Sequence, residues 1–136
     1  MIAVDTSAIV AIALNEPERA VFRDAILQAD TALISTASVL EAKLVLHGRR
    51  GPRAVALAED LFRLPLFDIV PPGPEDLDAA FRAFIVFGKG SGHPAALNFG
   101  DLFSYALAKV RGLPLLFKGN DFAETDIPPA VALPSA

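Results

Sequence analysis

Short apolar segments alternate with longer amphipathic segments along this chain. The short segments predict strands at residues 2–4, 32–35, 67–70 and 113–117, and a last short strand at 131–133. The longer segments carry apolar residues at helical spacing and predict helices at residues 8–14, 17–29, 36–46, 53–64, 75–87 and 99–110. Residues 88–94 hold three glycines and a proline, which is typical of a flexible loop.

Strands that alternate with helices indicate a parallel sheet covered by helices on both faces, and residues 1–136 are predicted to form one α/β domain. In such sheets, ligands bind beyond the carboxyl ends of the strands. This rule points to Asp5, which directly follows the first strand, and to residues 118–121, which follow the fourth.

The apolar content is high, because 53% of the residues are hydrophobic and the mean hydropathy is +0.45. An interior rich in Ala and Leu and an apolar surface for a partner are both expected. The first apolar run is too short to span a bilayer, contains Asp5, and lacks a basic leader, so neither a membrane segment nor a signal peptide is predicted. The absence of cysteine excludes disulfides and thiolate metal sites, and a cytoplasmic location is the simplest interpretation.

The net charge of −4 argues against bulk electrostatic attraction to nucleic acid, but local basic residues could still steer an RNA. The alternative for each of them is an ordinary solvated surface charge. The candidates for RNA steering are Arg49, Arg50, Arg53, Lys89 and Lys118.

Four acidic residues stand where a parallel sheet would bring them together, and each also has a structural explanation. Asp5 could cap a helix or form an Asx turn, and Asp101 could be the acid of a capping box with Asn98. Asp121 follows the turn residues 118–120 and could be an ordinary turn acid.

Glu41 is the fourth acid, and its position on a helix is informative. Ala37, Leu40, Leu44 and Val45 form an apolar stripe at helical spacing, and Glu41 falls within this stripe. If the stripe faces the core, the carboxylate needs a partner, which could be a metal ion or an arginine.

Taken together, the four acids predict an all-oxygen pocket, which suits Mg²⁺ or Mn²⁺. Like charges at 4–6 Å repel by roughly 3–4 kcal/mol at an effective dielectric near 20, so such a cluster requires a cation. Its expected use is a metal-activated water that attacks phosphorus, which needs no catalytic His or Cys.

At these residues the chain closely resembles the PIN-domain ribonucleases, and specifically the VapC toxins of prokaryotic toxin–antitoxin modules. The resemblance covers essentially the whole chain, and its specific motifs are NFGD and GNDF. The matching segments are VDTSA at 4–8, SVLEA at 38–42, GHPAALNFGD at 92–101, YALA at 105–108 and LFKGNDF at 116–122.

The resemblance implies a three-layer α/β/α sandwich, Mg²⁺-dependent endoribonuclease activity, a homodimer, and a VapB-type antitoxin that forms heterotetramers or larger complexes with it. It assigns the acidic quartet to Asp5, Glu41, Asp101 and Asp121. Many relatives have Cys where this chain has Leu102, a packing difference, and Asp126 is a weak fifth candidate. The supporting polar positions that it implies are Thr6, Ser7, Asn98 and Asn120.

Other functions fit the pattern less well. A phosphoacceptor receiver domain needs an acid pair at the first strand and an Asp after the third, and a haloacid-dehalogenase-type phosphatase needs a second Asp where Ser7 stands. A catalytically silent PIN-like binding or scaffold module is the remaining alternative.

Overall fold

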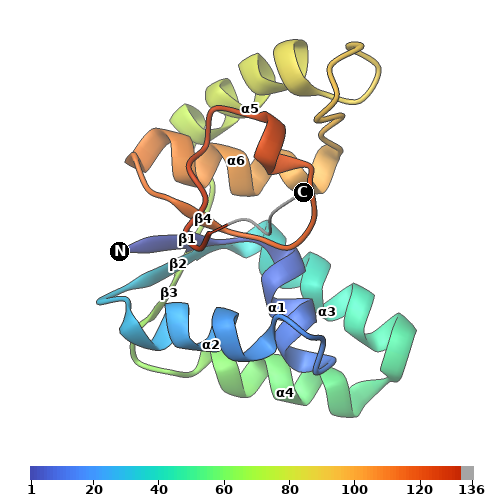
Figure 1. The fold of residues 1–136 in the computed structure, drawn as a ribbon, viewed down its shortest axis with the longest axis vertical. Helices are drawn as coiled ribbons and strands as arrows, with labels where there is room; N and C mark the ends of the chain where they lie inside the picture. Colours follow the sequence, from blue (N-terminus) through green and yellow to red (C-terminus); the bar gives the residue numbers. More distant parts are fainter. Residues whose placement is uncertain (133–136) are drawn as a thin grey trace.

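A computed structural model describes residues 1–132 as a four-stranded sheet with helices on both sides (Figure 1). The strands are all parallel and lie in the order β3-β2-β1-β4. Three of these four strands have the predicted bounds, and β4 is shorter than the predicted strand at 113–117. The strands are β1 (Ile2–Val4), β2 (Ala32–Ser35), β3 (Phe67–Val70) and β4 (Leu115–Leu116).

Six α-helices and one short 3₁₀ helix connect or follow these strands within the described residues. All six predicted helices are present, with ends that differ by a few residues. The α-helices are α1 (Thr6–Ala13), α2 (Arg19–Gln28), α3 (Thr36–Arg50), α4 (Pro52–Phe62), α5 (Pro74–Phe87) and α6 (Phe99–Arg111). The 3₁₀ helix is η1 (Phe122–Glu124).

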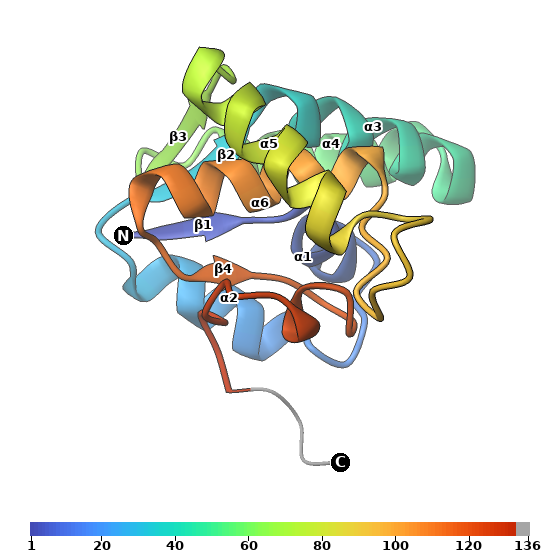
Figure 2. The same cartoon turned by 90° about the horizontal axis from the view of Figure 1, so that it is seen from above.

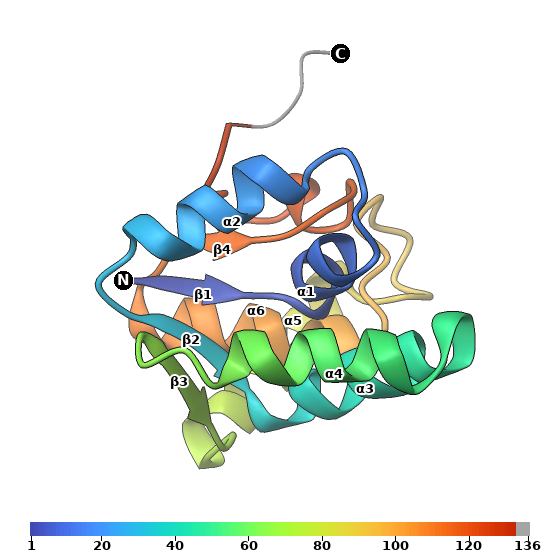
Figure 3. The same cartoon turned by 90° about the horizontal axis from the view of Figure 1, so that it is seen from below.

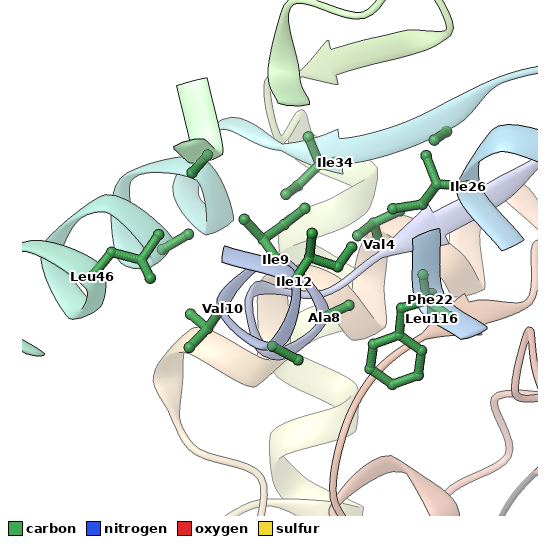
Figure 4. Packing of buried hydrophobic residues seen from close by; sticks show 14 of the residues in the cluster. Val4, Ala8, Ile9, Val10, Ile12, Phe22, Ile26, Ile34, Leu46 and Leu116 are labelled. Atoms are coloured by element: carbon green, nitrogen blue, oxygen red, sulfur yellow. The ribbon is translucent and has the colours of Figure 1, made fainter. Parts of the chain in front are cut away.

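Alternate residues of the strands feed two separate hydrophobic clusters, one on each face of the sheet. Val4 and Ile34 pack with Ile9 of α1 and Phe22 of α2 on the face that α1 to α4 cover (Figure 3; Figure 4). Ala3 and Leu33 belong to the opposite cluster, under α5 and α6 (Figure 2). The α/β/α sandwich is therefore confirmed, and the period-2 alternation of the strands explains it.

The last predicted strand, at 131–133, is wrong for residues 131 and 132, which are irregular, while residue 133 lies outside the described part of the chain. The chain instead touches the edge of the sheet slightly earlier. Pro129 forms an isolated parallel bridge with Leu115, and the backbone N–H of Ala130 donates to the Leu115 carbonyl at 2.8 Å. Proline lacks an N–H, so Pro129 cannot donate to a longer ladder here.

Apolar residues are found both in the interior and on the surface, while the use of this surface by a partner stays a prediction. Besides the two buried clusters, α5 exposes a stripe of large apolar side chains at helical spacing. In the part of the chain that the structure describes, no helix is long and apolar enough to cross a bilayer. The exposed stripe consists of Leu77, Phe81, Phe84 and Ile85, and Val86 is exposed on another side of the helix.

Candidate functional site

Asp5 lies at the carboxyl end of β1 and begins α1. Its side chain is only 3% exposed. The backbone N–H and the hydroxyl of Ser7 both donate to Asp5 Oδ2, at 3.0 and 2.6 Å. The predicted alternative, in which Asp5 caps the first helix, is therefore confirmed. Capping uses only Oδ2, so it does not exclude a second role for this carboxylate.

Asp101 lies in the first turn of α6, which begins on the side of the sheet where β1 ends and α1 begins (Figure 2). The Asp101 N–H donates to Asn98 Oδ1 at 2.9 Å, and the Asn98 N–H donates to Asp101 Oδ2 at 3.0 Å. This reciprocal pair is the predicted capping box. It fixes the Asp101 carboxylate at the start of the helix.

The prediction that Glu41 stands on a core-facing stripe of α3 is wrong. Leu40 and Leu44 of that stripe are 59% and 65% exposed, and the buried face of α3 is formed by Ser38, Ala42 and Leu46. Helical spacing identifies the residues that share a face, but it does not identify which face is buried. The buried face of α3 is the one that carries the small residues Ser38 and Ala42, together with Leu46. Glu41 lies beside the buried face and is partly exposed.

Three of the four predicted acids nevertheless line one open cleft of about 460 Å³, together with Thr6 and Ser7. Asp5, Glu41 and Asp101 reach it from β1, α3 and α6. Glu41 approaches α6 so closely that a Cβ at Gly100 would collide with its carboxylate. Glycine at the residue before Asp101 thus permits Glu41 to lie against the first turn of α6.

The electrostatics of Asp101 show that the charges of the other three acids act on this carboxyl group. Its pKa is raised to about 7, first by burial and then by the negative charges of Asp5, Asp121 and Glu41, although the Asn98 N–H opposes the shift. Asp121 does not line the cleft, but it is near enough for its charge to act on Asp101. The predicted convergence is therefore reflected in the energetics of one carboxyl group.

The donors at this cleft fit a hard divalent cation. Among the described residues, no Lys, Arg or His lies within ion-pair distance of any of the four acids, so the alternative of a salt bridge for Glu41 is not observed. Within residues 1–132, no three acidic or histidine side chains stand close enough to form a ready-made metal site. Carboxylates without a cation repel one another, and the all-oxygen chemistry of the set suits Mg²⁺ or Mn²⁺.

Comparison with known proteins identifies the family, because the PIN domain profile matches residues 2–128. This chain belongs to the PIN-domain family. It is 45% identical over 124 residues to Ribonuclease VapC28 of Mycobacterium tuberculosis, covering 91% of this chain and 93% of that protein. It is 44% identical over 131 residues to Ribonuclease VapC30 of the same species, covering 96% and 98%.

A solved structure confirms that the fold is that of a PIN domain. The crystal structure of Mycobacterium tuberculosis VapC20, described as a sarcin–ricin loop cleaving toxin, superposes with a TM-score of 0.76. The match covers 93% of this chain and 96% of the VapC20 chain at 17% sequence identity. At this identity, the likeness shows a shared fold.

The supporting polar residues of this PIN domain tie the ends of its strands together. The Ser7 hydroxyl accepts the backbone N–H of Lys118 at 2.9 Å, so the segment after β4 is fastened to the group that holds Asp5. The Thr6 hydroxyl donates to the Ser38 carbonyl at 3.1 Å and joins α1 to α3. Asn120 is exposed beside Asp121, in the same segment as Lys118.

The basic residues predicted to steer RNA occupy different environments. Only two of them line the acidic cleft, namely Arg49 and Lys118. The Lys118 ammonium pairs with Glu16 at 3.2 Å and with Glu18 at 3.0 Å, so its charge is already matched. The others lie on exposed surface outside the cleft lining: Arg50, Arg53 and Lys89.

Asp126, the weak fifth candidate, has partners of its own. The Tyr105 hydroxyl donates a hydrogen bond to Asp126 Oδ1 at 2.6 Å, and the Lys109 ammonium lies 2.7 Å from Asp126 Oδ2. Lys109 is eight residues beyond Asp101 on α6, about 12 Å along the helix axis. Asp126 therefore serves to hold the segment after η1 against α6.

Three residues of the site were not identified from the sequence: Gly100, Ser104 and Ser38. The Ser104 hydroxyl donates to Asp5 Oδ1 at 2.5 Å, and the Ser38 and Ser104 hydroxyls lie 3.2 Å apart. A signal was present, because Ser104 follows Asp101 by three positions and Ser38 precedes Glu41 by three. Residues three apart share a helix face, so polar residues at that spacing from a candidate acid belong in the search.

The raised pKa of Asp101 predicts an unusual pH dependence of stability. Between pH 4 and 7 the folded metal-free protein binds a proton that the unfolded chain has released, so its stability falls as the pH rises through this range. Asp101→Asn removes this slope, and at pH 8 without metal the variant should have the higher Tm. Mg²⁺ should raise the Tm of the wild type at pH 8 and that of the variant much less. A wild-type Tm in chelator with no more pH dependence than the variant's would contradict this account.

Gly100→Ala should separate stability from metal binding. Alanine favours helix by up to about 1 kcal/mol over glycine, and the group in its way is the flexible end of Glu41, so the metal-free Tm should be equal or higher. The displaced Glu41 should reduce the rise in Tm that Mg²⁺ produces. Gly48→Ala is the matched control, because a Cβ there meets nothing within 4 Å. A full Mg²⁺ effect in Gly100→Ala would show that Glu41 need not lie against α6.

Proposed function

We propose that this PIN domain is a Mg²⁺- or Mn²⁺-dependent endoribonuclease that acts as the toxin of a toxin–antitoxin pair. The observation that carries the proposal is the convergence of negative charge on Asp101 in a cleft at the carboxyl ends of the strands. The ribonuclease names of relatives that match nearly the full chain support it.

In this proposal, Asp5, Glu41 and Asp101 hold the ion through carboxylate oxygens, and Asp121 adds negative charge beside them. A bound divalent ion supplies an activated water and stabilises the oxygen that leaves phosphorus. The chain itself orients the carboxylates through the helix starts of α1 and α6. Arg49, exposed at the rim of the same cleft, is placed to attract an RNA phosphate.

The test is cleavage of RNA by purified protein with Mg²⁺ or Mn²⁺, compared with the Asp5→Asn variant. We expect loss of at least about 100-fold in rate, since even residues that only support a metal ligand typically contribute 10–100-fold. Asp24→Asn is the control, because Asp24 is an exposed acid of α2 outside the cleft.

Two results would count against the proposal. Equal cleavage by the wild type and Asp5→Asn would assign the activity to a contaminating nuclease. The second result is a folded wild type that cleaves no RNA. If the protein is expressed without its partner and no cut sites can be mapped in total RNA, the silent binding module is favoured.

A ribonuclease toxin of this kind would meet its RNA in the cytoplasm, as the chain's lack of cysteine suggests.

The proposed partner is an antitoxin peptide that lies over the acidic cleft. An arginine of this peptide entering among Asp5, Glu41 and Asp101 would replace the charge of the metal and inhibit the enzyme. The absence of an ion-paired cation for these acids among the described residues supports this chemistry. Added antitoxin should then suppress the cleavage in competition with Mg²⁺.

The proposed homodimer would bury the apolar stripe of α5. Phe81 at its centre is 65% exposed, and monomers rarely leave so many large apolar side chains on one helix face in water. We expect light scattering to give a dimer for the wild type and a monomer for Phe81→Glu. Val21→Glu, on α2, changes a comparably exposed apolar residue and should remain dimeric. A wild type that is monomeric at micromolar concentration would overturn this assignment.

A further inference from the structure

Two serines that are almost completely buried connect the cleft to the interior. Ser104 of α6 is 0% exposed and Ser38 of α3 is 1% exposed. Buried hydroxyls require hydrogen-bond partners, and here each has one: Ser104 donates to Asp5 Oδ1 at 2.5 Å, and Ser38 lies 3.2 Å from Ser104. These contacts join residues 99 and 66 positions apart in the chain.

The direction of these hydrogen bonds follows from the number of protons. An ionised carboxylate only accepts, so the single hydroxyl proton of Ser104 is used on Asp5. Ser38 must then donate to the Ser104 oxygen. The resulting chain runs from Ser38 through Ser104 to Asp5, and each donation strengthens the next one.

The bonds to Asp5 leave one of its oxygens with a free acceptor site. A carboxylate oxygen accepts about two hydrogen bonds. Oδ2 already accepts two, from the N–H and the hydroxyl of Ser7. Within residues 1–132, Oδ1 accepts only one, from Ser104. A cation that binds Asp5 without breaking this arrangement therefore has Oδ1 as its ligand.

We propose that Ser104, supported by Ser38, is a positioning residue that fixes the Asp5 carboxylate so that it binds the divalent ion through Oδ1 alone. This inference rests on the proposed function. Ser104 touches neither metal nor substrate, and acts only through the orientation of Asp5. Ser104→Ala removes a hydrogen bond to a charged group and leaves the Ser38 hydroxyl without an acceptor, so it should also lower the Tm. The result specific to a positioning role is weaker metal binding by a variant that is still folded.

The experiment is a Mn²⁺ titration of the full chain without RNA, followed by the electron paramagnetic resonance signal of free Mn²⁺. We expect Ser104→Ala to bind Mn²⁺ about 10–100-fold more weakly than the wild type, and Ser104→Thr, which keeps the hydroxyl, to recover part of the loss. Ser38→Ala should weaken binding less. Ser35→Ala is the matched control, since Ser35 is similarly buried but its hydroxyl accepts the N–H of Ala37 at the start of α3 and makes no hydrogen bond to Asp5 among the described residues.

Thermal unfolding and RNA cleavage of the same samples separate the outcomes. Weak Mn²⁺ binding by folded Ser104→Ala, with normal binding by Ser35→Ala, supports the inference. Wild-type affinity in folded Ser104→Ala, or in folded Ser38→Ala if Ser104→Ala does not fold, overturns it while the proposed function stands. A wild type that neither binds Mn²⁺ nor cleaves RNA overturns both.

Discussion

The repulsion among carboxylates at the carboxyl ends of the strands is the constraint on which the rest of the site depends. Two charges about 5 Å apart repel by roughly 3 kcal/mol at an effective dielectric near 20. Hydrogen bonds to a charged group each return about 1.5–3 kcal/mol. Asp5 accepts three such bonds, and Asp101 accepts one among the described residues. Burial, together with the negative charges of Asp5, Asp121 and Glu41, raises the pKa of Asp101 to about 7.

Helix starts are therefore both structural and functional in this molecule. The N–H groups of a first helical turn need an acceptor, and an acid there satisfies them while gaining from the helix dipole. Asp5 is the N-cap of α1 and Asp101 is the acid of the capping box of α6, whose N-cap is Asn98, and the same bonds hold both charges at the cleft. The sequence suggested capping and metal binding as alternatives, but the structure shows that capping leaves Asp5 Oδ1 free for other partners.

The sequence was sufficient for the layers and for most of the strands, because period-2 and period-3.6 patterns arise from backbone geometry. It failed where the answer depends on contacts between distant segments. The stripe around Glu41 was assigned to the core, yet α3 packs through Ser38 and Ala42, whose small side chains let neighbouring elements approach. The bond from Ser104 to Asp5 joins residues 99 apart, and no local pattern encodes such a pairing.

The cleft is best understood as a site where cations compete. With the pKa of Asp101 near 7, a proton already neutralises part of the cluster at neutral pH in the metal-free protein. A divalent ion bound as proposed would have to displace that proton, so its apparent affinity should rise with pH until Asp101 is ionised. A guanidinium from a partner would relieve the same repulsion without supplying an activated water. One electrostatic property of the fold would thus favour both the proposed metal binding and the proposed inhibition by a basic partner.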